Sequence, residues 1–295
     1  DMNYKTGKVN FFTNYGLNTG KSHNYGFVER RDNNSLQNFI FDADNTSHLL
    51  KLGADIYINE KNTLSVYTTQ NFSDNTTNGN TKVTFANDAT FNSDSPLLSI
   101  SDSNSGAYNL NYKLEFDKEG HDLEFEANYS KTKSPEDANY KQLLNLDDFT
   151  TNYTEAVEND RNTKLFNLDY TNPVSKNGKL ELGLEARLRE TKNNNITSQH
   201  DFVYDDNNNL IPDGNDWFVT DARGNSSFEY NRDIYSAYAT YGHKFGKLSM
   251  QVGARLEQYE VDGTFIKSKG NITEKFTDEI LTVYPSTFFT YNPSE

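Results

Sequence analysis

The chain of 295 residues has no cysteine, one tryptophan and six prolines. The absence of cysteine excludes a disulfide framework and a thiolate metal site. No segment approaches the ~20 consecutive apolar residues that a membrane-spanning helix requires, and the mean hydropathy is -0.86. The opening residues Asp1–Tyr4 contain no apolar signal-peptide core. We therefore expect that such a peptide has been removed, or that the chain starts inside a longer polypeptide.

Positive charge is also scarce. Lys and Arg number 28 against 43 Asp and Glu, which gives a formal net charge of -15 at pH 7. Because phosphate binding requires clustered Lys and Arg, we expect no nucleic-acid partner. Much of the excess acid lies in two polar segments, Ser134–Asp160 and His200–Asp221.

The chain is rich in segments that alternate apolar and polar residues. From Tyr108 to Phe116 every second residue is Tyr, Leu or Phe, and the residues between them are Asn, Lys or Glu. After Asp117–Gly120 the pattern resumes from Leu123 to Tyr129. Successive side chains of a strand point to opposite faces, so the pattern predicts strands with one apolar and one polar face.

The segment Lys179–Glu190 alternates most regularly. A helical conformation would spread its leucines around the helix surface instead of forming a stripe, so we interpret the segment as a strand. The leucines are expected to contact lipid, while the charged residues face a polar interior. The first set is Leu180, Leu182, Leu184 and Leu188, and the second is Glu181, Glu185, Arg187 and Arg189.

Short turns alternate with long polar segments along the chain. This layout is typical of an antiparallel transmembrane β-barrel, which we predict as an all-β fold with about ten strands, each long enough to cross a membrane. A soluble β-sandwich would alternate too, but it explains neither the charged face nor the difference between the two ends. The turns are Asn59–Asn62, Asp117–Gly120, Pro173–Gly178 and Phe245–Lys247, and the segments read as loops are Phe72–Ser103, Ser134–Asp160 and Thr191–Ser226.

Several strand motifs carry a resemblance to a known family. They are Gly7–Phe12, Gly53–Tyr57, Arg232–Gly242, Val252–Glu257 and Tyr284–Phe289. With them the chain resembles the outer-membrane β-barrel family that forms the C-terminal barrel of TonB-dependent receptors in Bacteroidota. The resemblance covers nearly the whole chain, but its motifs identify architecture better than substrate.

The resemblance implies a barrel of about twenty-two strands, an N-terminal plug and a motif that engages TonB. The sequence departs from this pattern because it shows about ten strands, no plug and no such motif. We interpret residues 1–295 as one incomplete barrel domain, an internal segment of a larger receptor. The expected partners are outer-membrane lipid, the rest of the barrel and plug, TonB through the missing N-terminal part, and a surface lipoprotein.

The segment Thr191–Ser226 contains the candidate ligand contacts. Its aromatic residues could stack on a ligand at the extracellular mouth, although we favour packing of the loop on itself. Asp205, Asn207, Asn209 and Asp216 match four positions of a calcium loop, but Leu210 stands where that loop needs glycine and no bidentate Glu closes it. We therefore favour a solvated loop and expect no cofactor. The ligand-contact candidates are Tyr204, Asp205, Asp213, Trp217 and Phe218.

No catalytic motif is present and the five histidines are scattered, so we expect no enzyme. The leading hypothesis is part of a TonB-dependent receptor in the bacterial outer membrane that takes up a large or scarce nutrient. The alternative is an outer-membrane barrel that serves adhesion, binding or assembly without transport.

Overall fold

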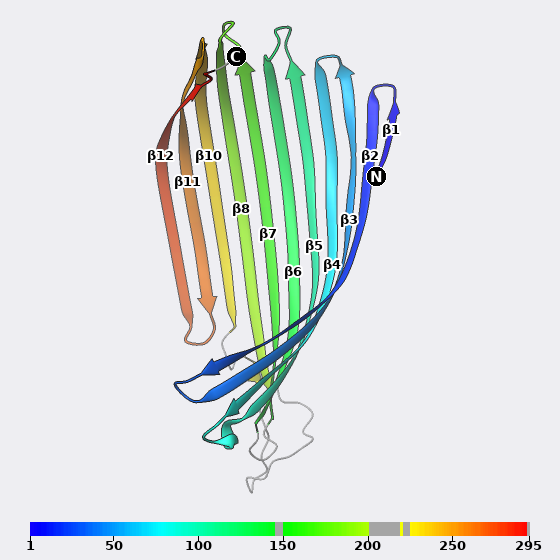
Figure 1. Ribbon diagram of the computed structural model, residues 1–295, viewed down its shortest axis with the longest axis vertical. Helices are drawn as coiled ribbons and strands as arrows, with labels where there is room; N and C mark the ends of the chain where they lie inside the picture. Colours follow the sequence, from blue (N-terminus) through cyan, green and yellow to red (C-terminus); the bar gives the residue numbers. More distant parts are fainter. Residues whose placement is uncertain (145–149, 201–218, 221–224, 294–295) are drawn as a thin grey trace.

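The computed structural model describes residues 1–144, 150–200, 219–220 and 225–293, and these form one antiparallel sheet (Figure 1). Eleven strands follow one another in the sheet, and the two-residue β9 pairs with β8 beside that path. The only helix in the described ranges is the short η1. The elements are β1 (Met2–Thr6), β2 (Val9–Arg30), β3 (Ser35–Asn59), β4 (Asn62–Phe85), η1 (Ala89–Phe91), β5 (Ser93–Glu115), β6 (Asp122–Leu144), β7 (Thr150–Asn172), β8 (Gly178–His200), β9 (Val219–Thr220), β10 (Ser226–Phe245), β11 (Leu248–Lys267) and β12 (Ile272–Tyr291).

Connections of two to six residues join the strands at one rim of the sheet, the upper rim in Figure 1. At this rim Gly7 and Gly246 adopt φ of 55° and 62°, a left-handed conformation that suits glycine in two-residue hairpin turns. The ends of β4 and β11 near Phe85 and Lys267 lie at the other rim. The predicted separation of turns is therefore confirmed for the described residues; the segments around Asn145 and Asn209 lie outside them.

Polar contacts support both rims. At the short-turn rim, the side chain of Lys61 hydrogen-bonds the Asp117 carboxylate and lowers its pKa. At the opposite rim, the hydroxyl and the backbone N–H of Thr90 donate to Asp88 at 2.5 and 3.0 Å, which lowers the pKa of Asp88 and caps η1. The first pair joins the β3–β4 connection to the β5–β6 connection, and the second acts within the β4–β5 connection.

The long loops expected between strands are wrong in their length. β4 continues to Phe85 and β5 begins at Ser93, so most of Phe72–Ser103 is strand. The same holds for Ser134–Asp160, where β6 ends at Leu144 and β7 begins at Thr150, and for the start of Thr191–Ser226, where β8 continues to His200. Alternation weakens in these parts because both faces are mostly polar, while the backbone hydrogen-bond ladder continues.

The strand count is close to the expected ten. The ten long strands are β2 to β8 and β10 to β12. The additional strand is β1, which pairs with β2 over only five residue pairs. Such a short and mostly polar strand has too few residues to show a period.

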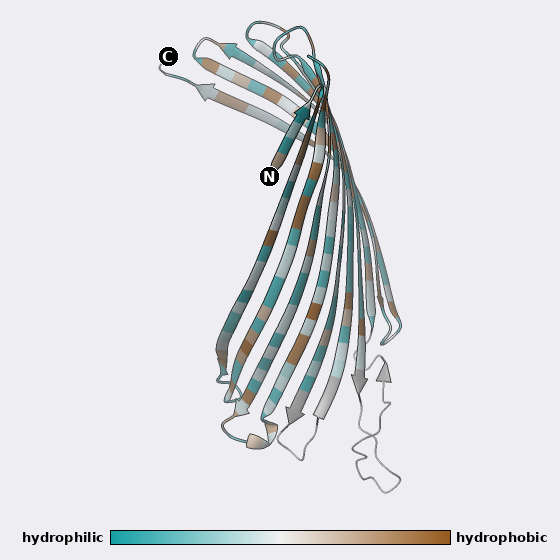
Figure 2. Cartoon of the chain, turned by 90° about the vertical axis from the view of Figure 1, so that its right-hand side faces the viewer, coloured by the Kyte–Doolittle hydropathy of each residue, from teal (hydrophilic) through white to brown (hydrophobic). Residues whose placement is uncertain are grey.

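The sheet has two chemically distinct faces, visible as alternating colours along the strands in Figure 2. We call the face that carries Leu184 the apolar face and the face that carries Glu185 the polar face. Leu184 is 57% exposed, and most of the exposed large hydrophobic side chains share its face. Among the described residues, the buried ones other than glycine all lie on the polar face, which is thus the crowded, concave one. They are Ser35, Ser99, Ala138, Thr197 and Ser236.

This arrangement leaves the described residues without an apolar core: Ala138 is the only buried hydrophobic residue among them. In the described ranges no second layer covers the apolar face, which is inconsistent with a β-sandwich. So large an exposed apolar surface requires an apolar environment. Among the described residues, no helix has the length and hydrophobicity to span a bilayer.

The apolar residues form a band that crosses the strands obliquely. On β11 the apolar run ends at Leu256, whose row in the register leads across the sheet to Val9 on β2. On β2 the run continues eight residues further, to Leu17. Eight residues of about 3.3 Å over eight strand steps of about 4.8 Å correspond to a tilt of about 35°. Strands of transmembrane barrels tilt by about 35–45° against the membrane normal. At such a tilt this band would lie parallel to the plane of a membrane.

Several glycines on the polar face are covered by aromatic rings from the neighbouring strand. The pairs are Gly26–Phe39, Gly53–Phe12, Gly79–Phe41, Gly183–Tyr238 and Gly263–Phe276. In the fourth pair the Tyr238 ring crosses β8 over Gly183, and its hydroxyl donates to Asp169 on β7 at 2.5 Å. The glycine therefore lets one tyrosine bridge three strands.

Gly183→Ala should destabilise the fold by about 1–3 kcal/mol, the usual cost of overpacking. A Cβ at this position would overlap the Tyr238 ring and displace its hydroxyl from Asp169. Gly242→Ala is the matched control on the same face, because its Cβ meets only a backbone oxygen at 3.9 Å. Urea unfolding in lipid vesicles measures both variants, and equal stabilities would contradict the proposed role of this pair.

Candidate functional site: the polar face of the sheet

The polar face of β8, β10 and β11 carries a network of charged side chains. Arg255 donates from Nη2 to Glu185 Oε1 at 3.1 Å and to Ser236 Oγ at 2.6 Å, and from Nε to Glu257 Oε2 at 3.2 Å. Arg187 Nη2 lies 3.4 Å from the same oxygen of Glu185. The Glu185 side chain is only 17% exposed, and its two arginine partners offset the cost of removing this charge from water.

The network belongs to a row that carries carboxylates at intervals from β3 to β11. In the register, the row of Glu185 and Glu257 continues through Glu126 on β6 to Asp55 on β3. Asp55 accepts from Asn10 at 3.2 Å and Ser65 at 2.7 Å, and Glu126 accepts from Asn167 at 3.2 Å. Neighbouring strands thus satisfy these carboxylates, which makes the row compatible with the wall of a polar cavity.

The polar face of β2 to β6 has a different character, because its outer half carries small and mostly uncharged side chains. Six of its β5 positions are serines, from Ser93 to Ser105. The last of them, Ser105, lines a groove of about 550 Å³ together with Gly16, Thr69 and Thr132 of neighbouring strands and the larger Leu49 and Asn71. Side chains as small as serine leave space above the sheet instead of filling it.

Beyond the apolar band, the polar face carries a stacked aromatic pair. Tyr140 and Tyr153 lie with ring centroids 4.4 Å apart and an interplanar angle of 9°. Burial raises the pKa of Tyr140, and the nearby Glu155 carboxylate acts in the same direction. The Tyr140 hydroxyl therefore stays protonated at physiological pH and can act as a hydrogen-bond donor.

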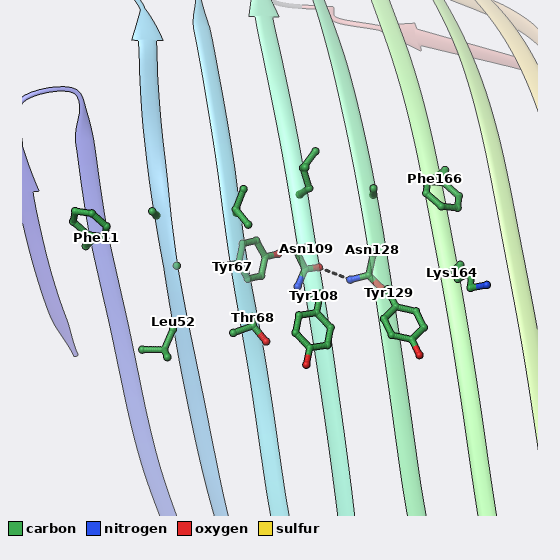
Figure 3. Close-up of a pocket in the computed structure, with 15 residues that line it drawn as sticks. Phe11, Leu52, Tyr67, Thr68, Tyr108, Asn109, Asn128, Tyr129, Lys164 and Phe166 are labelled. Atoms are coloured by element: carbon green, nitrogen blue, oxygen red, sulfur yellow. Dashed lines mark hydrogen bonds between the residues drawn. The ribbon is translucent and has the colours of Figure 1, made fainter.

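A second groove, of about 680 Å³, lies on the apolar face of β2 to β7 (Figure 3). Phe11, Tyr108, Tyr129 and Phe166 project into it from four strands, with Lys164 at its edge. The dashed hydrogen bond in the figure joins Asn109 and Asn128, which belong to the polar face. Because this groove opens on the apolar face, its lining suits hydrocarbon chains better than a polar solute.

Of the residues predicted from sequence, one group lies on the polar face and the other lies outside the described residues. Glu181, Glu185, Arg187 and Arg189 share the polar face, opposite the four leucines, as predicted. The ligand-contact candidates and the calcium-like segment all lie within residues 201–218, outside the described residues. These candidates are Tyr204, Asp205, Asp213, Trp217 and Phe218. In the described ranges, no group of three or more His, Asp or Glu is placed to hold a metal ion.

Sequence reasoning missed the groove of small residues on β2 to β6. The available signal was the recurrence of serine at every second position from Ser99 to Ser105, which begins inside a segment read as a loop and ends at a residue that lines the groove. Recognising it required knowing that the segment is a strand, because only then do alternate serines share a face.

A family model described as the outer membrane protein beta-barrel family matches residues 114–295, more than half of the chain. No curated protein sequence matches the chain. Three solved structures show weak similarity. The outer membrane protease OmpT of Escherichia coli is 10% identical, with 96% of each chain covered and a TM-score of 0.29. The ferric citrate transporter FecA is 10% identical, with 95% of this chain and 42% of that chain covered and a TM-score of 0.42.

The third structure is the translocator domain of the autotransporter NalP from Neisseria meningitidis. It is 7% identical, with 95% of this chain and 89% of that chain covered and a TM-score of 0.23. The chain thus spans less than half the length of the FecA structure. No conclusion about function follows from similarities of this size.

Proposed function

Because the chain belongs to the outer membrane protein beta-barrel family, we propose that it forms part of the wall of a TonB-dependent receptor that takes up a large or scarce nutrient. Its location is the bacterial outer membrane, with the apolar face toward lipid and the polar face toward the lumen. The proposal assigns no catalytic role to these residues.

The groove of small side chains on the polar face is the observation that carries this proposal. In narrow barrels of about eight strands, side chains fill the interior. Here small residues such as Gly16, Thr69 and Ser105, with a few asparagines and leucines, line a groove of about 550 Å³ on the polar face of β2 to β6. The side chains of such a wall leave part of the lumen empty, and a plug domain or a solute would occupy that space. The row of satisfied carboxylates from Asp55 to Glu257 supports a hydrated lumen.

The remaining parts of the proposed receptor lie outside these residues. Further strands of the same receptor would close the barrel, and a plug would occupy the lumen and couple it to TonB. A surface lipoprotein at the outer rim is a further proposed partner.

The outward extension of the strands favours the alternative of an adhesion or assembly scaffold. Beyond the apolar band, β3 to β8 continue with both faces mostly polar and present a largely hydrated sheet away from the membrane. A surface of this kind could bind another macromolecule without passing anything through the barrel.

A growth comparison distinguishes the two. The native host is grown on a panel of single nutrient sources after deletion of the full-length gene, and separately after loss of TonB. The proposal predicts that the deletion abolishes growth on one source, and that loss of TonB abolishes growth on the same source. Unchanged growth on every source, together with lost attachment to surfaces, would favour the scaffold.

A further inference from the structure

Four arginines come together on the polar face of three adjacent strands. Arg189 on β8 stands directly opposite Arg232 on β10 in the register. Arg187 lies two residues before Arg189 on the same face. Arg161 on β7 lies opposite Thr191 and is therefore the diagonal neighbour of Arg189 on that face. The other three arginines all act electrostatically on the Arg189 guanidinium. We call these four residues the arginine cluster.

Three members of the arginine cluster have no counter-charge. Among the described residues only Arg187 forms an ion pair, with Glu185, whereas Arg161, Arg189 and Arg232 form none. The Nε atoms of Arg189 and Arg232 are inaccessible to solvent and have no hydrogen-bond partner. This is unexpected in a chain with 43 acidic and 28 basic residues, where a carboxylate could easily have been placed nearby.

Such an arrangement opposes folding, because like charges placed directly opposite on neighbouring strands repel each other. A buried donor without a partner adds to that cost. The carboxylate network a few residues away shows that this sheet can neutralise arginine, since Arg255 alone contacts two glutamates. The unpaired positive charge of the arginine cluster therefore points to a partner from outside the sheet.

Aromatic side chains border the arginine cluster on its outward side. Tyr230 lies two residues before Arg232 on the same face and stacks with Phe228, with ring centroids 6.0 Å apart. Phe276 lies 6.2 Å from Tyr230, and the hydroxyl of Tyr259 lies 3.4 Å from that of Tyr230. Flat rings beside guanidinium groups can receive the apolar face of a ring-shaped ligand while the arginines hold its anionic groups.

We propose that the arginine cluster is a binding subsite for an anionic ligand whose sulfate, phosphate or carboxylate groups accept paired hydrogen bonds from the guanidinium groups. The planar fork of arginine matches all three oxyanions. The adjoining rings favour an anion carried on a saccharide or another cyclic scaffold. This inference rests on the proposed uptake function only in treating that ligand as cargo.

Binding of defined polyanions to the purified full-length protein tests the proposal. The probes are short oligomers of dextran sulfate, polygalacturonate and polyphosphate, with neutral dextran as the control ligand, in detergent at low ionic strength. The variants are Arg189→Gln, Arg232→Gln and the double substitution. Lys164→Gln is the matched control, because it removes the same charge from the opposite face of β7.

At least one anionic oligomer should bind the wild-type protein while neutral dextran does not, and its affinity should fall as salt is added. Which oligomer binds identifies the oxyanion. Each single glutamine variant should raise its Kd by about tenfold, a usual size for a lost charge-assisted pair, while Lys164→Gln leaves the Kd unchanged. Equal affinities of Arg232→Gln and Lys164→Gln, or no binding of any of the three anions, would overturn the proposal.

A second measurement guards against loss of folding in the variants. If the arginine cluster is maintained for a ligand at a cost to stability, Arg189→Gln should raise the unfolding temperature of the ligand-free protein, and the anion should stabilise the wild type more than the variant. A lower unfolding temperature would indicate that the cluster serves the fold itself and would count against the proposal. Binding without any growth defect in the deletion strain would refute the uptake function and leave the subsite intact.

Discussion

Replacing Leu184 with arginine should lower the free energy of unfolding in lipid by about 2–4 kcal/mol. This is the cost of a cation near the midplane on the lipid side of a barrel. Leu184 lies on the apolar face of β8 and is 57% exposed. It lies within the row that ends the apolar run on β11, between apolar neighbours on β7 and β10. Urea titration of the full-length protein in vesicles measures the effect.

Ser105→Arg is the control for this prediction. It introduces the same side chain on the polar face, where the groove that Ser105 helps to line provides space and hydration. Its folding free energy should stay within about 1 kcal/mol of the wild type, as for a surface substitution that breaks no contact. Similar losses in both variants would show that the two faces do not differ in their surroundings.

Residues 1–295 expressed alone should fail to form a monomer that inserts into detergent or lipid. In the described part of the chain the path of the sheet ends at β1 on one side and at β12 on the other. Most of β2 beyond Thr13 has no partner on the β1 side, because β1 pairs only with Val9–Thr13. Unpaired backbone groups are costly in hydrocarbon, since no water is available to satisfy them.

Heat-modifiable migration on gels, together with the far-ultraviolet dichroism of the refolded sample, measures this second prediction. Aggregation of the isolated segment, and recovery when it is expressed as part of the full-length protein, is the expected result. A refolded monomer in which Val9–Leu17 pairs with Leu281–Tyr291 would instead show that these strands close a small barrel by themselves.

The faces of the strands could be predicted from the sequence because alternation has a direct physical cause. On β8 the leucines from Leu180 to Leu188 must share a face in any strand, and the structure places them opposite Glu185 and Arg187. The short turns were equally readable, since Gly7 and Gly246 occur where two-residue hairpins need a positive φ.

The outward halves of the strands could not be predicted because water solvates both of their faces. Between Phe72 and Phe85 a polar side chain is tolerated on either side, so alternation carries no signal and composition resembles a loop. The pairing of Arg189 with Arg232 was inaccessible for another reason. It depends on the register between β8 and β10, which are joined through a connection too long to determine the register from turn geometry.

A cysteine scan along β8 tests the central claim that the two faces meet lipid and water respectively. The chain has no native cysteine, so single substitutions from Leu180 to Arg189 in the full-length protein report without background. Each variant is treated in outer-membrane vesicles with a small water-soluble maleimide. Labelling should be strong at Glu181, Glu185 and Arg187 and weak at Leu182 and Leu184. Uniform labelling along the strand, or labelling of the leucine positions in place of the charged ones, would contradict the account.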